Sequence, residues 1–92
     1  MTEIWLLTTY HESELGRVEE NVIEYDSEEN AKKDMKGMWE ACLRKKDAEF
    51  CIIDEDSYCG TDEALVSMHD GTAIIFEVTV TNELIQRKKD RN

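Results

Sequence analysis

Apolar residues recur along the chain with two different periods, and each change of period marks an element. Residues 4–10 and 17–25 are rich in branched and aromatic side chains and predict two strands. Gly16 lies between them and can adopt the positive φ that a tight turn requires. Glutamates interrupt the second segment, which is typical of an edge strand. The pattern therefore predicts an N-terminal hairpin.

The segment after this hairpin has the period of a helix. Asp26, followed three residues later by Glu29, fits a capping box and predicts a helix start at Asp26. One apolar stripe follows and consists of Ala31, Met35, Met38, Trp39, Cys42 and Leu43. Acidic residues precede it and three basic residues (44–46) follow it, so the charges suit the helix dipole at both ends. We expect one long amphipathic helix.

The remainder of the chain predicts three more strands. Residues 49–54 contain a short apolar run and predict a buried strand. An acidic loop follows at 54–62, with Gly60 as its pivot. Residues 64–69 and 72–81 are β-rich segments on either side of Asp-Gly, which is a preferred two-residue hairpin turn.

A two-residue turn fixes the register of this last hairpin. The expected opposite pairs are Met68 with Ala73, Val66 with Ile75, and Leu65 with Phe76. One sheet face then carries Leu65, Ile74, Phe76, Val78 and Val80, and the other carries Val66, Met68, Ala73 and Ile75. Because one helix covers only one face, the second apolar face is covered either by other parts of the fold or by a partner or second copy of the chain.

The expected fold class is therefore α+β. A mainly antiparallel sheet carries one long helix on one face, in the order β-β-α-β-β-β. With 92 residues the chain has the length of a single domain, which we place at residues 1–82, and residues 83–92 form a basic C-terminal tail that we expect to be frayed.

The first residues and the composition indicate the compartment in which we expect the protein. The first residues lack the basic and apolar regions of a signal peptide, and no stretch has the roughly 18 apolar residues that a membrane span needs. The three cysteines are an odd number without a secretion signal, which favours reduced thiols. We expect a cytoplasmic protein that does not contact a membrane.

The charge is strongly negative and unevenly distributed. The net charge is −11, residues 1–31 hold nine acidic side chains against one basic, and residues 47–82 hold nine acidic and no basic side chains. Only residues 32–46 are basic, with six basic and two acidic side chains. Direct binding to nucleic acid is therefore not expected, because phosphates would meet negative potential almost everywhere.

No catalytic motif is present. The sequence has no GxSxG, GxxxxGK[ST], HExxH or GxGxxG pattern. His11 and His69 are the only histidines, and neither has an orienting partner nearby in the sequence, as a general base would need. We expect a protein that is not an enzyme.

The sequence also contains candidate metal ligands. Cys51, Cys59 and His69, with Cys42 as a further thiol, are the residues that a zinc ion would use. The Cys-x7-Cys spacing departs from that of zinc sites, and a buried strand or helix stripe already accounts for two of the thiols. The segment 54–60 begins like a calcium loop, but its glycine is one place late and position twelve is Leu65 rather than glutamate. No cofactor is expected.

Two clusters of carboxylates are the main candidate site. They consist of Glu19, Glu20, Glu24, Asp26, Glu28 and Glu29, and of Asp54, Glu55, Asp56, Asp62 and Glu63. One interpretation is a solvated surface that keeps the protein soluble. The other is a binding surface for the basic groove of a nucleic-acid-binding protein, where carboxylates take the place of phosphates. The alternative function is a small accessory module that dimerises or is stabilised by zinc.

The layout also resembles a known class of proteins. A short N-terminal hairpin, the segment Tyr25-Asp26-Ser27-Glu28-Glu29-Asn30-Ala31 before a lysine-rich helix, an acidic loop and an Asp-Gly hairpin are similar to small acidic proteins of phages and mobile elements. Some of these are anti-CRISPR proteins, which bind and inhibit effector nucleases. The resemblance implies an inhibitor of a nucleic-acid-handling protein, with CRISPR effector nucleases as one class of partner, and transfers no functional residue.

Overall fold

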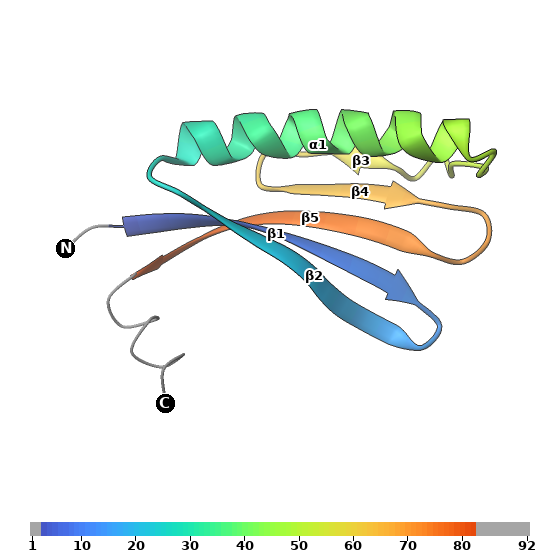
Figure 1. Ribbon diagram of the computed structural model, residues 1–92, viewed down its shortest axis with the longest axis horizontal. Helices are drawn as coiled ribbons and strands as arrows, with labels where there is room; N and C mark the ends of the chain where they lie inside the picture. Colours follow the sequence, from blue (N-terminus) through green and yellow to red (C-terminus); the bar gives the residue numbers. More distant parts are fainter. Residues whose placement is uncertain (1–2, 83–92) are drawn as a thin grey trace.

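The computed structural model describes residues 3–82, which form one antiparallel sheet with a helix on one face (Figure 1). The elements are β1 (Glu3–Ser13), β2 (Gly16–Tyr25), α1 (Glu28–Ala48), β3 (Tyr58–Cys59), β4 (Glu63–Ser67) and β5 (Ala73–Asn82). The strands lie side by side in the order β2-β1-β5-β4-β3. The predicted α+β class is confirmed, and the order of strands and helix agrees.

The sheet is built around two long central strands. β1 pairs along its length with β2 on one side and β5 on the other. β2 is an edge strand, as its glutamates predicted, and the turn before it uses Gly16 at φ +117°. The pairing of β1 with β2 shifts between Thr9 and Tyr10, which leaves Glu20 as an extra residue in β2. Such a bulge increases the local twist of the sheet.

The helix begins one residue later than the sequence predicted. Ser27, not Asp26, is the N-cap, with extended backbone and a side-chain oxygen that accepts a hydrogen bond of 3.2 Å from the amide of Asn30. Asp26 is the wrong cap because the residue whose side chain reaches the third helical amide is Ser27. Glu28 lies in the first turn and Lys46 in the last, which suits the helix dipole.

The predicted helical stripe packs on the sheet. Ala31 and Met35 are 0% and 1% exposed, and the other four stripe residues are partly buried against the same core. The buried core consists of Leu7, Ala31, Met35, Ala64, Val66, Met68, Ile74, Phe76 and Val78. Trp39 also donates a hydrogen bond of 2.9 Å from its indole Nε1 to the backbone oxygen of Leu65, which ties the helix to β4.

The strand predicted at 49–54 is wrong. Phe50 is 92% exposed and Ile52 is 65% exposed, and Ile53 contributes only an isolated bridge to Met68. This apolar run lies in the connection after the helix, and the short strand β3 forms later, within the predicted acidic loop. An apolar run without periodicity does not distinguish a buried strand from an exposed connection.

The register predicted for the last hairpin is also wrong by one residue. Val66 lies opposite Ile74 and Leu65 opposite Ile75, so Val66 and Met68 are buried under the helix with Phe76. The predicted second face of Val66, Met68, Ala73 and Ile75 is therefore split between the two sides of the sheet. The cause is a three-residue loop at 69–71. The amide of Gly71 donates to Met68, and Gly71 has φ +92°, which is typical of a turn with a bulge.

Two further predictions concern the ends and the surroundings of the chain. The tail predicted at residues 83–92 lies outside the described residues. Within residues 3–82, no helix has the length and apolar character needed to cross a membrane.

Candidate functional site

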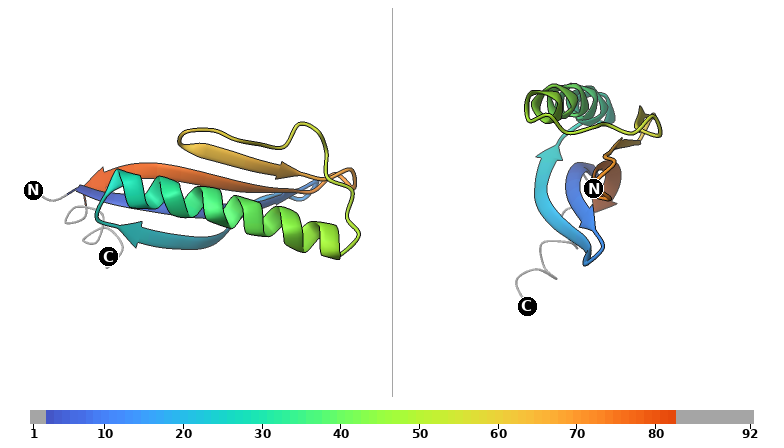
Figure 2. Two further views of the ribbon diagram at one scale, coloured as in Figure 1. Left: turned by 90° about the horizontal axis from the view of Figure 1, so that it is seen from above. Right: turned by 90° about the vertical axis from the view of Figure 1, so that its right-hand side faces the viewer.

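The predicted carboxylates do not form one continuous surface. Glu19, Glu20 and Glu24 lie on the edge strand β2, and Asp26, Glu28 and Glu29 lie at the start of α1. Asp54, Glu55, Asp56, Asp62 and Glu63 lie in or beside the segment that leads from α1 through β3 to β4. Because β2 and β3 are opposite edges of the sheet, the three glutamates on β2 are separated from the second cluster, which lies on the β3 side (Figure 2).

Several of these carboxylates have local roles. Glu28 forms an ion pair of 2.9 Å with Lys32, and Glu63 accepts a hydrogen bond from the hydroxyl of Tyr58. Asp54 accepts a hydrogen bond of 3.3 Å from the amide of Asp56. Glu55 and the side chain of Asp56 are exposed and form no ion pair or hydrogen bond within residues 3–82. They remain available to a partner.

The connection from α1 to β3, residues 49–57, contains the segment 49–54 that was wrongly predicted as a strand, and it has unusual geometry. Phe50 has φ +62°, the only non-glycine residue between 3 and 82 with positive φ. Its amide donates to the carbonyl of Asp47 at 3.0 Å, and the amide of Cys51 donates to Lys46 at 2.9 Å. These two bonds form a Schellman helix end, where the left-handed position is usually glycine.

Hydrogen bonds hold the rest of this connection against β4. The amide of Asp54 donates to the carbonyl of Ser67 at 2.7 Å, and the amide of Ser67 donates to the hydroxyl of Ser57 at 2.8 Å. The amide of His69 donates to the carbonyl of Ile52 at 2.9 Å. The connection is therefore anchored at several points, while the side chains of Phe50 and Ile52 face solvent.

The structure does not bring the zinc candidates together. Cys51 and Cys59 pack against the core, and His69 is exposed in the loop between β4 and β5. Among the residues that the structure describes, no group of three histidine, cysteine or acidic side chains has the arrangement of a metal site. The calcium-like start at Asp54 forms a short turn, in which Ser57 donates its amide to the carbonyl of Asp54.

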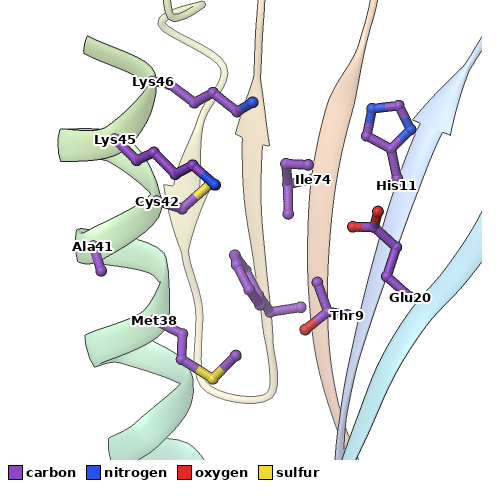
Figure 3. A pocket seen from close by; sticks show the side chains of 10 residues that line it. Thr9, His11, Glu20, Met38, Ala41, Cys42, Lys45, Lys46 and Ile74 are labelled. Atoms are coloured by element: carbon purple, nitrogen blue, oxygen red, sulfur yellow. The ribbon is translucent and has the colours of Figure 1, made fainter. Parts of the chain in front are cut away.

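A groove of roughly 430 Å³ opens between the C-terminal half of α1 and the sheet (Figure 3). Its lining is apolar at the base and charged at the rim, and consists of Thr9, His11, Glu20, Met38, Ala41, Cys42, Lys45, Lys46, Ile74 and Phe76. Lys45 and Lys46 extend from the helix, and His11 and Glu20 face them from the strands. Its volume lies in the lower part of the range of about 300–1,000 Å³ for ligand pockets.

Two side chains that line the groove, and one at the other end of the helix, have notable environments. Burial raises the pKa of the Cys42 thiol, and the nearby Lys46 and Lys45 oppose this shift. Thr9 lines the groove and is 9% exposed, and its Oγ1 is the one buried side-chain polar atom in the described part of the chain without a hydrogen-bond partner. At the other end of the helix, burial and the hydrogen bond of 2.7 Å that Tyr25 donates to Asp34 raise the pKa of Tyr25 to about 12.

Sequence reasoning missed both Phe50 and the groove. A weak signal for Phe50 existed, because Asp47-Ala48-Glu49 continues the helix and no glycine follows to end it. No pattern in the sequence indicated the groove, because its presence depends on where the twisted sheet and the helix diverge.

Comparison with known proteins adds no relative: no protein-family model, no curated protein and no solved structure matches the chain.

Proposed function

We propose that the protein is a non-enzymatic acidic binding protein that inhibits a nucleic-acid-handling partner. Its contact surface is the connection at residues 49–57. The observation that carries the proposal is Phe50, an aromatic side chain that is 92% exposed on a backbone held at φ +62°.

The fold gains little from Phe50. A left-handed backbone costs an ordinary L-residue roughly 1–2 kcal/mol, and an exposed side chain returns no burial energy to offset it. Glycine would end the helix without this cost. Strained residues persist where function uses them, and aromatic residues dominate the energetics of interfaces. Phe50 is therefore suited to insert into an apolar pocket on a partner.

The surroundings of Phe50 indicate the charge of that partner. Glu49, Asp54, Glu55 and Asp56 lie within six residues of Phe50, and no basic side chain occurs between residues 47 and 82. Carboxylates around an aromatic anchor complement an apolar pocket with lysine and arginine at its rim. Grooves that hold nucleic-acid phosphates are basic in this way, so occupation by this segment would exclude nucleic acid.

The resemblance to small acidic phage proteins suggests which partners to examine first. CRISPR effector nucleases have positively charged channels for the guide–target duplex, and such a channel is the kind of surface that the acidic segment complements. We therefore place the partner among basic nucleic-acid-binding proteins, with effector nucleases as the first class to test.

The test compares two double charge reversals in binding to a panel of purified effector nucleases. Glu55→Lys/Asp56→Lys alters the proposed surface, and Glu19→Lys/Glu20→Lys alters the same number of exposed adjacent carboxylates on β2. Both raise the net charge of −11 by four units, so their overall electrostatics are matched. The first variant is expected to lose binding and inhibition of DNA cleavage, and the second to keep most of both.

The parent's affinity should also fall as salt concentration rises, and DNA should compete for the same site. If the β2 variant loses binding and the loop variant keeps it, the contact surface is the β2 edge. If no member of the panel binds the parent, the assignment to effector nucleases is wrong.

A further inference from the structure

The groove under the C-terminal half of α1 is a feature that binding through residues 49–57 does not use. It exists because the helix is straight and the sheet is twisted. Trp39 holds the helix over β4, while β1 and β2 turn away from it toward their shared hairpin (Figures 1 and 2). The bulge at Glu20 adds to this divergence.

The base of the groove suits an apolar group. Met38 and Cys42 from α1 face Ile74 from β5 across it, and Phe76 of β5 is a further lining residue. Ile74 and Phe76 are 8% and 3% exposed, so rigid strands form one wall and the helix forms the other. Met38 and Cys42 are half-buried and Ala41 is exposed, so a small apolar body placed here would remove their surface from water, which is the main source of affinity in such sites.

The charged residues at the rim of the groove determine which ligand charge is favoured. Lys46 is engaged by Glu49 at 3.3 Å, whereas Lys45 forms no ion pair within residues 3–82 although the protein is strongly acidic. Glu20 lies on the opposite rim and repels anions there. An anionic head group would therefore lie on the helix side, beside Lys45.

The sheet side of the groove also carries an unpaired hydroxyl group. Thr9 is nine-tenths buried and lines the groove, yet its hydroxyl has no hydrogen-bond partner. Buried hydroxyl groups are usually satisfied, and leaving one without a partner costs about 1–3 kcal/mol. A ligand atom that hydrogen-bonds to Thr9 would remove this cost.

We propose that this groove is a binding site for a small organic anion with an apolar body. The anionic head pairs with Lys45, the body packs on Met38 and Phe76, and a polar atom at the far end of the body hydrogen-bonds to Thr9. The site shares no lining residue with the contact surface at residues 49–57 and would operate whether or not that surface binds a nuclease.

The test uses three probes with one chain length and different heads: octanoate, octanol and octylammonium. Titration followed by amide NMR shifts should show saturable binding of octanoate at Thr9, Cys42 and Phe76. Octylammonium should bind at least about tenfold more weakly, because its charge meets Lys45 instead of pairing with it. Equal binding of the two ions, or no saturable shifts with octanoate, would overturn the proposal.

Matched variants identify the residues. Lys45→Gln should weaken octanoate binding about fivefold or more, and Lys33→Gln, which removes the same charge from an exposed helical position outside the groove, should leave it unchanged. Glu20→Gln should tighten binding about twofold, because it removes repulsion from the opposite rim. Equal effects of Lys45→Gln and Lys33→Gln would show that net charge, not the groove, attracts the anion.

A fourth probe measures the contribution of Thr9 to the affinity for the ligand. 8-Hydroxyoctanoate carries a hydroxyl at its far end and should bind about threefold tighter than octanoate, the gain of one ordinary hydrogen bond. Thr9→Val, which keeps the shape of the side chain, should abolish that difference. Retention of the full difference in the variant would contradict the assigned contact.

Cysteine labelling gives a readout with internal controls. Cys42 lines the groove, whereas Cys51 and Cys59 do not, and all three are free and partly buried. Octanoate should slow alkylation of Cys42 by N-ethylmaleimide and leave the rates at Cys51 and Cys59 unchanged, as measured by peptide mass spectrometry. Equal protection of the three thiols would indicate general stabilisation of the fold and would count against a bound ligand.

Discussion

The two ends of α1 meet the sheet in different ways. At the N-terminal end, Ser27 caps the helix, and Ala31 and Met35 are packed on the core at 0% and 1% exposure. At the C-terminal end the helix terminates on Phe50 in a left-handed conformation, and a groove separates its last turns from the sheet. One end is closed and unstrained, and the other is open and strained.

The difference follows from the shape of the two layers. Strands in a sheet rotate relative to one another, so a straight helix can remain in close contact with only part of a twisted sheet. Here the close contact involves the first half of α1, and the exposed features gather where the layers diverge. The fully buried helix residues and the proposed binding surfaces therefore lie at opposite ends of one helix.

The largest expected effect is a difference between two methionines one helical turn apart. Met35→Ala should destabilise the protein by about 2–5 kcal/mol, because it leaves a cavity in the closed end. Met38→Ala should cost less than about 1 kcal/mol, since Met38 is only partly buried and already lines the groove. Urea denaturation monitored by circular dichroism measures both. Equal costs would show that the two ends are packed alike.

The next effect concerns the bond that holds the middle of the helix to β4. Trp39→Phe removes the donor to Leu65 and should cost about 1–2 kcal/mol more than a control substitution, because the backbone oxygen loses its partner. The control is Trp5→Phe, whose indole donates no hydrogen bond within the described residues and packs against the same core. The same denaturation experiment compares them, and similar losses would mean that the bond contributes little.

A smaller effect, with the opposite sign, is expected at the open end. Phe50→Gly removes the strain of the left-handed position and should stabilise the protein by about 0.5–1 kcal/mol, or a few degrees in Tm. Ile52→Gly is the control, because Ile52 is also exposed but does not have positive φ. Thermal melting measures both variants. A loss of stability in Phe50→Gly would show that the side chain contributes to the fold.

The smallest effect appears only in alkaline solution and concerns the closed end. The pKa of Tyr25 is raised to about 12 in the folded protein, so the folded state keeps its proton at a pH where the unfolded state loses it. The contribution of protonated Tyr25 to the free energy of unfolding is complete below about pH 10 and is lost as the pH rises toward 12. Tyr25→Phe should therefore lose less stability than the parent between about pH 10 and 12 in urea titrations. Parallel pH profiles would contradict this role.

The sequence predicted the closed end well and the open end poorly. The helical stripe from Ala31 to Leu43 was readable because a 3.6-residue period over many positions has one structural interpretation. Phe50 was read as a strand residue because its run of apolar neighbours carries no period, and the hairpin register failed because Asp70-Gly71 also fits a three-residue loop.

The candidate sites show the same limit. The carboxylates were visible in the sequence, but the separation of the β2 glutamates from the cluster beside β3 depends on strand order, which places β2 and β3 farthest apart. The groove depends on how far a twisted sheet departs from a helix tied to it by Trp39, a relation between elements distant in the chain. Neither relation is encoded in local patterns.

The measurement that tests the central claim most directly is the effect of Phe50→Gly on stability and on binding in the same preparation. The account predicts that the variant melts at a higher temperature than the parent and binds a partner nuclease from the panel at least about tenfold more weakly, the loss expected for an aromatic anchor. A variant that is more stable and binds as tightly as the parent would contradict the claim that the open end of the helix is the binding end.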